Sequence, residues 1–323
     1  MFLRKDCTIG QMENQVPDEI KKATAKRRGC EALADSFQRQ GLEGKAGRVR
    51  NCGTQLTFAY VLEEERLELH QANYCRERLC PMCAWLRTKK VFAQVSQVMD
   101  AAEQERPELV PVFLTLTVRN CTAAELGAVL DSISQGWNRL NANKRMKRLI
   151  VGWFRALEIT YNEREDTYHP HLHAVLLMPP SYFTEPKDYM TTEQWVKLWR
   201  KAMRLDYDPV CDIRRVEPGE DKAGAVAEVA KYTVKDSDYI KPNPALTDKL
   251  VSVFSAAVKG RRLVAFGGLM KEIAKRLKLN LEDMEPGEIT GADGRVLRKD
   301  IDYILLLYRW NIGLTRYDYE REV

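Results

Sequence analysis

The sequence lacks any apolar run long enough to cross a bilayer. A membrane helix needs about 20 apolar residues in succession, whereas the longest runs, such as residues 303–307, are far shorter. The amino terminus reads MFLRKD and lacks the apolar stretch and the small-residue cleavage site of a signal peptide. We therefore expect a cytoplasmic protein that has no membrane partner.

The chain also lacks internal repeats, low-complexity tracts and a strong net charge. Its 323 residues are 45% hydrophobic and 30% charged, which is typical of a globular protein, and the length suggests about two domains. A net charge of +5 permits nucleic-acid binding without requiring it. Basic clusters at residues 144–148, 259–262 and 271–278 fit solvated helix faces and phosphate contacts equally well.

The spacing of the eight cysteines is not that of a disulfide scaffold. Cys75, Cys80 and Cys83 lie within nine residues, which in a reducing compartment indicates a metal site. Cys52 is the best fourth ligand and His70 the alternative; four thiolates would form a closed, structural Zn²⁺ site. The remaining cysteines are expected to be incidental buried thiols: Cys7, Cys30, Cys121 and Cys211.

Hydrophobic periodicity divides the chain into strands and helices. It predicts strands at residues 54–59, 67–73, 112–118, 152–161, 171–178, 211–216 and 303–310. It predicts helices at residues 18–28, 87–106, 191–204 and 222–235, and one that opens with a capping box of Thr122 and Glu125. The predicted fold class is α+β, with a central antiparallel sheet flanked by helices and an N-terminal zinc-binding module. The predicted divisions are an N-terminal arm (1–50), a cysteine-rich zinc module with a helix (51–106), a sheet domain (107–241) and a basic C-terminal segment (242–323).

Three of the four histidines lie within five residues, in the segment HPHLH at 169–173. On a strand, His171 and His173 point to the same face and can share one metal ion. His169 either joins them or caps the loop. A hairpin turn near residues 164–165 places Glu158 opposite His171 and His173, where an unpaired carboxylate would be costly without a metal partner. Two imidazoles and one carboxylate suit Mn²⁺ or Mg²⁺ acting on a phosphate.

A tyrosine follows on the predicted helix 222–235. Glu228 and Tyr232 are four residues apart and share a helical face, and Lys235 adjoins them. A tyrosine is a poor nucleophile unless a metal holds the electrophile and a cation lies nearby, which Lys235 could supply. Glu228 could activate a water molecule. Tyr239 is a competing candidate that we expect to be a packing residue.

These segments together resemble the rolling-circle replication initiators of small plasmids, in the branch of the HUH (His-hydrophobe-His) endonuclease superfamily that uses one tyrosine and one glutamate. The similarity runs from about residue 50 to 240, in the order of the family's motifs. The matching segments are CRERLCPMC at 75–83, FLTLTVRN at 113–120, LEITYN at 157–162, HPHLH at 169–173 and EVAKY at 228–232.

The resemblance implies that residues 107–241 nick DNA, with the histidines on a middle strand. It implies that His171 and His173 bind the metal, that Tyr232 forms a 5′-phosphotyrosyl link, and that Glu228 serves the terminating hydrolysis. The expected partner is a single-stranded or hairpin origin, and a host polymerase and a host helicase are candidate partners. The expected DNA contacts are Arg76, Arg78, Arg87, Lys231, Arg261 and Arg262.

Two alternatives stay open at the level of the sequence. One is another enzyme of the superfamily, a conjugative relaxase or a single-tyrosine transposase. The other is a zinc-dependent nucleic-acid-binding protein without catalysis. The oligomeric state and the role of residues 242–323 are left open as well.

Overall fold

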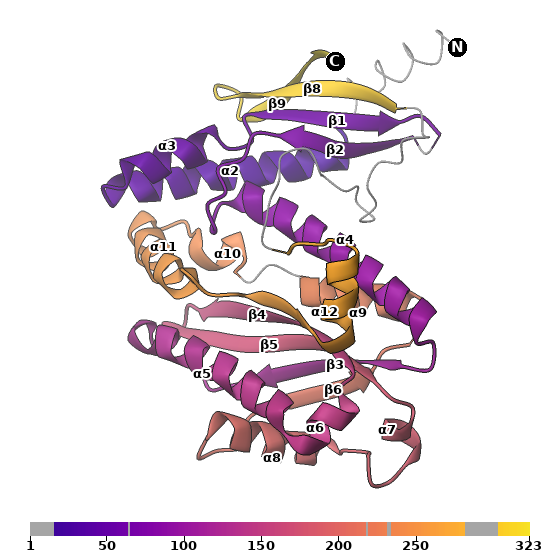
Figure 1. The fold of residues 1–323 in the computed structure, drawn as a ribbon. Coiled ribbons are helices and arrows are strands. Elements are labelled where there is room, and N and C mark those ends of the chain that lie inside the picture. Colours follow the sequence, from indigo (N-terminus) through magenta and orange to yellow (C-terminus); the bar gives the residue numbers. More distant parts are fainter. Residues whose placement is uncertain (1–15, 64, 218, 231–233, 282–302) are drawn as a thin grey trace. The chain divides into compact units, whose positions relative to one another are not determined.

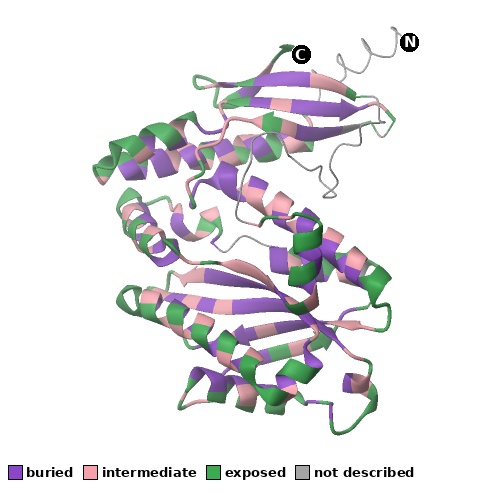
Figure 2. Cartoon of the chain, in the orientation of Figure 1, coloured by how far each residue is buried: buried purple, intermediate pink, exposed green. Residues whose placement is uncertain are grey.

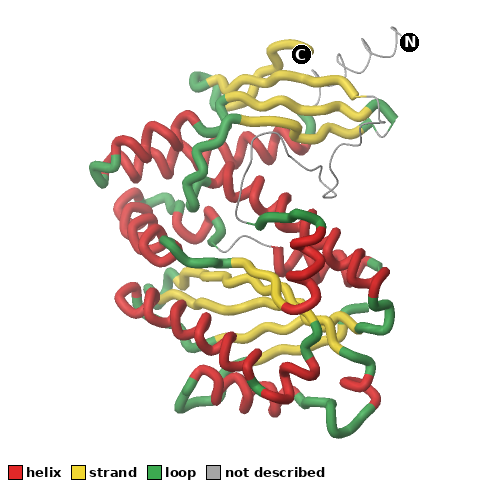
Figure 3. The backbone as a smooth tube through the Cα atoms, viewed as in Figure 1, coloured by secondary structure: helices red, strands yellow, loops and turns green. Residues whose placement is uncertain are grey.

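The chain forms two compact units, each with an antiparallel sheet of its own. A computed structural model describes residues 16–63, 65–217, 219–230, 234–281 and 303–323. The first unit comprises residues 1–89, 242–248 and 284–323, and the second comprises residues 90–241 and 249–283. The predicted α+β class is confirmed by this mixture of helices and antiparallel sheets (Figure 3).

The first unit packs helices on a four-stranded sheet with the strand order β2-β1-β8-β9. Its elements are α2 (Asp18–Arg39), α3 (Glu43–Asn51), β1 (Gln55–Val61), β2 (Arg66–Ala72), β8 (Tyr303–Asn311), β9 (Arg316–Glu322) and the beginning of α4 (Pro81–Glu105). Figure 1 shows α2 along one face of this sheet, where the guanidinium of Arg27 lies 5.3 Å from the centroid of the Trp310 ring.

The end of the chain completes this first sheet, so the structure divides the chain differently from the predicted boundaries. β1 pairs with β8 along its whole length, with Phe58 opposite Leu306. The described part of the predicted arm, from residue 16 onward, forms the helices α2 and α3 and belongs to the same unit, in which α2 buries Leu33 and Phe37. A two-stranded hairpin is marginal by itself, and β8 supplies the third strand and the apolar side chains that make it stable.

The second unit has a five-stranded sheet with the order β6-β3-β5-β4-β7. Its strands are β3 (Val110–Thr117), β4 (Gly152–Asn162), β5 (Thr167–Met178), β6 (Cys211–Arg215) and β7 (Val264–Gly267). The helices that follow α4 are α5 (Ala123–Ala142), α6 (Lys144–Leu149), α7 (Ser181–Thr184), α8 (Thr192–Met203), α9 (Glu220–Ala230), α10 (Asp236–Tyr239), α11 (Pro244–Val258) and α12 (Gly268–Arg276). The predicted capping box at the start of α5 is present.

Both faces of the middle strand β5 are buried over most of its length (Figure 2). Leu172 and Leu176 lie on the face that α5 covers. On the opposite face, Val175 belongs to an apolar cluster with Val95 of α4 and Val229 of α9. That apolar surface gives way to the histidines toward the beginning of β5, so a polar site adjoins a rigid core.

The described residues contain no helix with the length and hydropathy that crossing a membrane requires.

Candidate metal centres

The β4–β5 hairpin fixes which side chains face each other. Its turn is stabilised by Asn162, whose side-chain oxygen accepts hydrogen bonds from the backbone N–H groups of Arg164 and Glu165. The resulting register pairs Glu158 with His171, as predicted from the sequence. Because alternate residues share a face, His173 points to the same side of the sheet as His171. The histidines lie on the middle strand of the sheet, as the resemblance implied.

The three predicted ligands converge on one point. Glu158 Oε2 lies 3.4 Å from His171 Nε2 and 3.4 Å from His173 Nε2. The ligand atoms of the three residues all lie within 4.8 Å of one another. Ligand atoms that are each about 2.1 Å from one ion, at angles near 100°, are roughly 3.2 Å apart. The observed spacing therefore fits a metal ion shared by the three side chains.

The remaining ring nitrogens also have partners, which orient the imidazoles. His171 Nδ1 donates to the backbone carbonyl of His169 at 3.2 Å, and His173 Nδ1 lies 3.0 Å from Thr115 Oγ1. A proton on Nδ1 leaves the lone pair on Nε2 free for an ion. The sequence left open whether His169 joins the metal ligands or caps the loop. The centroid of its ring lies 5.2 Å from that of His171, and its Nδ1 donates to the side-chain oxygen of Asn120. It flanks the ligand group without belonging to it.

Lys235 also reaches this centre. Its Nζ lies 2.8 Å from Glu158 Oε1, the carboxylate oxygen that does not face the histidines. Burial by itself would raise the pKa of Glu158, but the imidazoles of His171 and His173 and the ammonium of Lys235, which all face the carboxylate, outweigh it and hold that pKa well below its usual range. The same carboxylate raises the pKa of Lys235. Glu158 is therefore a carboxylate and Lys235 a cation at neutral pH.

The predicted helix 222–235 is wrong at its end. α9 is described as far as Ala230, Val234 is not helical, and Lys235 has an extended backbone at the position before α10. Lys235 therefore does not share a helical face with Glu228, although the charge of Glu228 contributes to the raised pKa of Lys235. From this extended position Lys235 reaches Glu158.

The predicted nucleophile Tyr232 and the predicted DNA contact Lys231 lie outside the described residues. Glu228 is half-buried on α9. The competing tyrosine, Tyr239, is fully buried, and its ring centroid lies 6.2 Å from that of Phe254. Tyr239 is thus a packing residue, as expected from the sequence.

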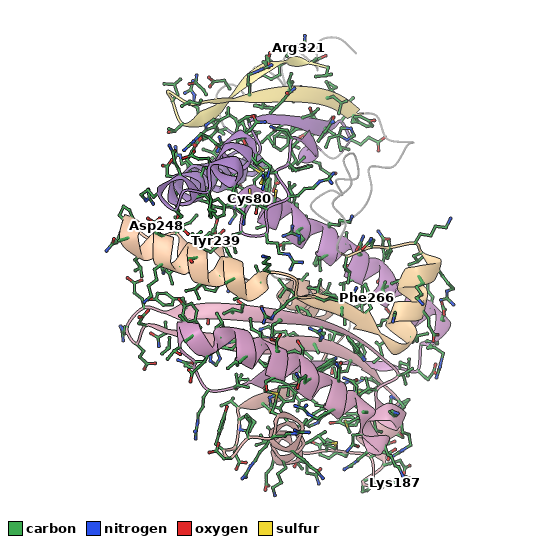
Figure 4. The ribbon with its side chains drawn as sticks, turned by 60° about the vertical axis from the view of Figure 1, so that its left-hand side comes forward. Cys80, Lys187, Tyr239, Asp248, Phe266 and Arg321 are labelled. Carbon is green, nitrogen blue, oxygen red and sulfur yellow. The ribbon has the colours of Figure 1, made fainter. Side chains whose placement is uncertain are left out.

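A second candidate centre lies in the first unit, at the beginning of α4, where Figure 4 labels Cys80. The Sγ atoms of Cys52, Cys75, Cys80 and Cys83 all lie within 4.8 Å of one another. Neighbouring pairs are 3.5 to 3.6 Å apart. A tetrahedral ion with sulfur ligands at about 2.3 Å has sulfur atoms roughly 3.8 Å apart. The four thiols fit such an ion, and Cys52 rather than His70 completes the set.

A fifth sulfur adjoins this cluster. Cys30, which the sequence analysis treated as incidental, is fully buried on α2, with its Sγ 3.5 Å from that of Cys80. Its position on the apolar face of α2, in register with Leu33 and Phe37, was the available signal. That signal shows burial but not which partner the residue meets, because the cluster comes from a different part of the chain.

The predicted DNA contacts differ in how the fold uses them. Arg76 and Arg78 are exposed beside the cysteine cluster, Arg262 is exposed, and Arg87 is half-buried on α4. Arg261 is held within the second unit. Its guanidinium donates to both oxygens of Asp131 and to the backbone carbonyls of Ala257 and Gly127.

Comparison with known proteins gives one consistent family. Residues 66–318 match the family model described as "Replication protein". The chain is 40% identical to "Protein rep" of Bacillus amyloliquefaciens over 76% of each chain. It is 36% identical to "Protein rep" of Streptococcus pneumoniae serotype 2 (strain D39) over 88% of each. It is 34% identical to a "Replication protein" of Staphylococcus aureus, over 70% of this chain and 94% of the relative. No solved structure matches the chain.

Proposed function

The chain belongs to the replication protein family, and on that premise we propose that it initiates plasmid replication by nicking one DNA strand at a rolling-circle origin. The phenol oxygen of Tyr232 attacks a phosphodiester, the new O–P bond forms, and the bond from phosphorus to the 3′-oxygen breaks. The products are a 5′-phosphotyrosyl link and a free 3′-OH, which a host polymerase extends. A host helicase is a further candidate partner.

The observation that best supports this proposal is the convergence of Glu158, His171 and His173. Bound there, Mn²⁺ or Mg²⁺ would polarise the scissile phosphate and stabilise the negative charge that develops on it. Oxygen and imidazole ligands suit these ions. The three side chains belong to two adjacent strands of one sheet, so they need little rearrangement to bind a metal ion.

Two further charged groups complete the proposed mechanism. Lys235 binds the second oxygen of Glu158 and keeps that residue ionised and oriented. Glu228 precedes Tyr232 by four residues in the sequence. In the terminating step, Glu228 accepts a proton from a water molecule that hydrolyses the phosphotyrosyl link. The substrate is single-stranded or extruded DNA, because the attacked phosphate has to reach the metal centre.

The cysteine cluster has a structural role in this proposal. Four thiolates saturate a tetrahedral Zn²⁺ ion and leave no position for a substrate. The exposed Arg76 and Arg78 lie in the segment between Cys75 and Cys80, where they can contact the phosphate backbone of DNA.

Replacing Tyr232 by Phe tests the proposal. The protein is incubated with Mn²⁺ and a pool of single-stranded oligonucleotides labelled at the 3′ end, because the 3′ fragment stays attached to the tyrosine. The parent should give a labelled band that survives denaturation, and Tyr232→Phe should give none, because a phenyl ring has no oxygen to attack. Mass spectrometry of the adduct then locates the modified residue.

Tyr239→Phe is the matched control and should retain the adduct, because Tyr239 packs against Phe254. An unchanged adduct in Tyr232→Phe would reject Tyr232 as the nucleophile. No adduct from the parent, together with retained DNA binding, would favour the non-catalytic alternative. The relaxase and transposase alternatives also predict an adduct, and sequencing the attached DNA separates them by identifying an origin, a transfer site or a transposon end.

A further inference from the structure

The two metal-binding imidazoles are oriented by partners of different kinds. His171 Nδ1 donates to the backbone carbonyl of His169, an acceptor that every residue type provides. His173 Nδ1 instead meets a side chain, the hydroxyl of Thr115, at 3.0 Å. The state of His171 is therefore set by the backbone, whereas that of His173 depends on the residue type at position 115.

We propose that Thr115 is a positioning residue that holds His173 in the tautomer able to bind the metal ion. The inference rests on the proposed metal centre and adds to it a residue that does not touch the ion. In the metal-binding state, the Nδ1–H of His173 donates to Thr115 Oγ1, and the lone pair of Nε2 faces Glu158 and the ion.

The sheet fixes the geometry of this contact. Thr115 on β3 is directly opposite His173 on β5, so their side chains project from the same face at close range. Threonine is branched at Cβ and has few rotamers, which keeps its hydroxyl in place. The ring of Phe113 lies 5.6 Å from that of His173 and limits its rotation from a second side.

The burial of His173 makes the partner of Nδ1 important. Only 8% of the residue is exposed, so water is a poor substitute for the hydroxyl. Valine has the shape of threonine but places a methyl group where the hydroxyl was. An Nδ1–H facing that methyl group would lack an acceptor, so the imidazole would favour the tautomer with its proton on Nε2, which cannot bind a metal ion.

A neighbouring threonine gives a matched control. Thr117 lies on the same strand and the same face, opposite His171. Its hydroxyl donates to the backbone carbonyl of Val210 at 2.9 Å. Thr117→Val therefore removes a threonine hydroxyl beside the centre without changing the partner of either imidazole Nδ1.

The experiment measures Mn²⁺ binding to the full chain by electron paramagnetic resonance, without DNA. Thr115→Val should weaken binding by about 10- to 100-fold, the usual effect of removing such a supporting hydrogen bond. Thr115→Ser should restore most of the affinity, and Thr117→Val should bind like the parent. The melting temperature of Thr115→Val should stay near that of the parent, so that the loss of affinity and its recovery in Thr115→Ser report on the hydroxyl and not on folding.

His173→Ala separates the inference from the proposed function. If His173→Ala loses Mn²⁺ while Thr115→Val binds it like the parent, the metal centre stands and the role of Thr115 is rejected. An equal loss in Thr115→Val and Thr117→Val would also reject it, because the effect would then not depend on the imidazole contact. If His173→Ala retains parental affinity, the metal centre itself is wrong.

Discussion

At the residue scale, the two oxygens of Glu158 have different partners. Oε2 faces His171 and His173, and Oε1 accepts a hydrogen bond from Lys235. A carboxylate this deeply buried would be costly without such partners. Lys235, predicted as the cation beside Tyr232, thus contacts Glu158, a candidate metal ligand, and compensates its negative charge from the side that does not face the histidines.

Five cysteine thiols lie together at the candidate zinc site of the first unit. Cys52, Cys75, Cys80 and Cys83 form the ligand group, and Cys30 touches it through Cys80. Hydrogen bonds from Cys52, Cys75 and Cys80 lower the pKa of Cys83 well below its usual range. Zinc binds cysteine in the thiolate form, so binding of the ion would release the protons that remain on this group.

We predict that Cys30→Ala retains about one zinc ion per chain and that Cys80→Ser loses it, because four thiolates saturate a tetrahedral ion. Metal analysis of the purified variants measures the difference. The melting temperature of Cys30→Ala should fall modestly, since a buried sulfur is removed beside the cluster. Loss of zinc from Cys30→Ala and its retention in Cys80→Ser would mean that Cys30 is a ligand in place of Cys80.

At the element scale, the basic clusters serve partly to join helices to their surroundings. In the cluster at residues 144–148, Arg148 on α6 binds both carboxylate oxygens of the buried Asp188. Arg145 donates to backbone carbonyls of the same loop. In the cluster at residues 259–262, Arg261 joins the end of α11 to Asp131 of α5. These arginines act within the fold, so cluster charge alone is a poor guide to DNA contacts.

Arg261→Ala should therefore lower the free energy of unfolding by about 1 to 3 kcal/mol, the range for lost hydrogen bonds to charged groups. Urea denaturation measures the change. Asp131→Ala should have a smaller effect, and the double variant should be less destabilised than the sum of the two, because both changes remove the same ion pair. Unchanged stability in Arg261→Ala, with weaker DNA binding, would instead favour the predicted phosphate contact.

At the scale of the whole molecule, strands near the end of the sequence complete the sheet of the first unit. β8 is a middle strand of that sheet, paired to β1 on one side and β9 on the other. The hydroxyl of Tyr317 on β9 donates to the backbone carbonyl of Gly53, next to Cys52. Strand β9 thus supports the segment that carries Cys52, a candidate zinc ligand.

Deleting residues 303–323 should destabilise the first unit and weaken its binding of zinc, because β1 loses one of its two paired strands and only the β1–β2 hairpin remains of the sheet. Limited proteolysis should cleave the truncated protein within residues 16–89, and zinc should pass more readily to a chelator. Mn²⁺ binding should persist, because Glu158, His171 and His173 belong to the second unit. Loss of Mn²⁺ binding with an intact zinc site would contradict this division of roles.

The sequence by itself determined the features that depend on neighbours along the chain. Alternation and turn chemistry fixed the β4–β5 hairpin, and with it the pairing of Glu158 with His171. Short spacing also identified Cys75, Cys80 and Cys83 as a cluster. Periodicity carries this information because strand and helix geometry repeat over a few residues. Spacing also indicated that Glu228 and Tyr232 share a helical face, but the roles of these two residues in nicking DNA rested mainly on the resemblance to a family.

Only the tertiary structure decided which distant residues join these local features. It brought Cys30 to Cys80, Thr115 to His173 and the last strands to β1. It also placed Lys235 in an extended backbone before α10, where it reaches Glu158. Such contacts depend on how whole sheets and helices pack, and many distant residues have the chemistry to make them. Their choice is therefore a property of the complete fold rather than of any segment.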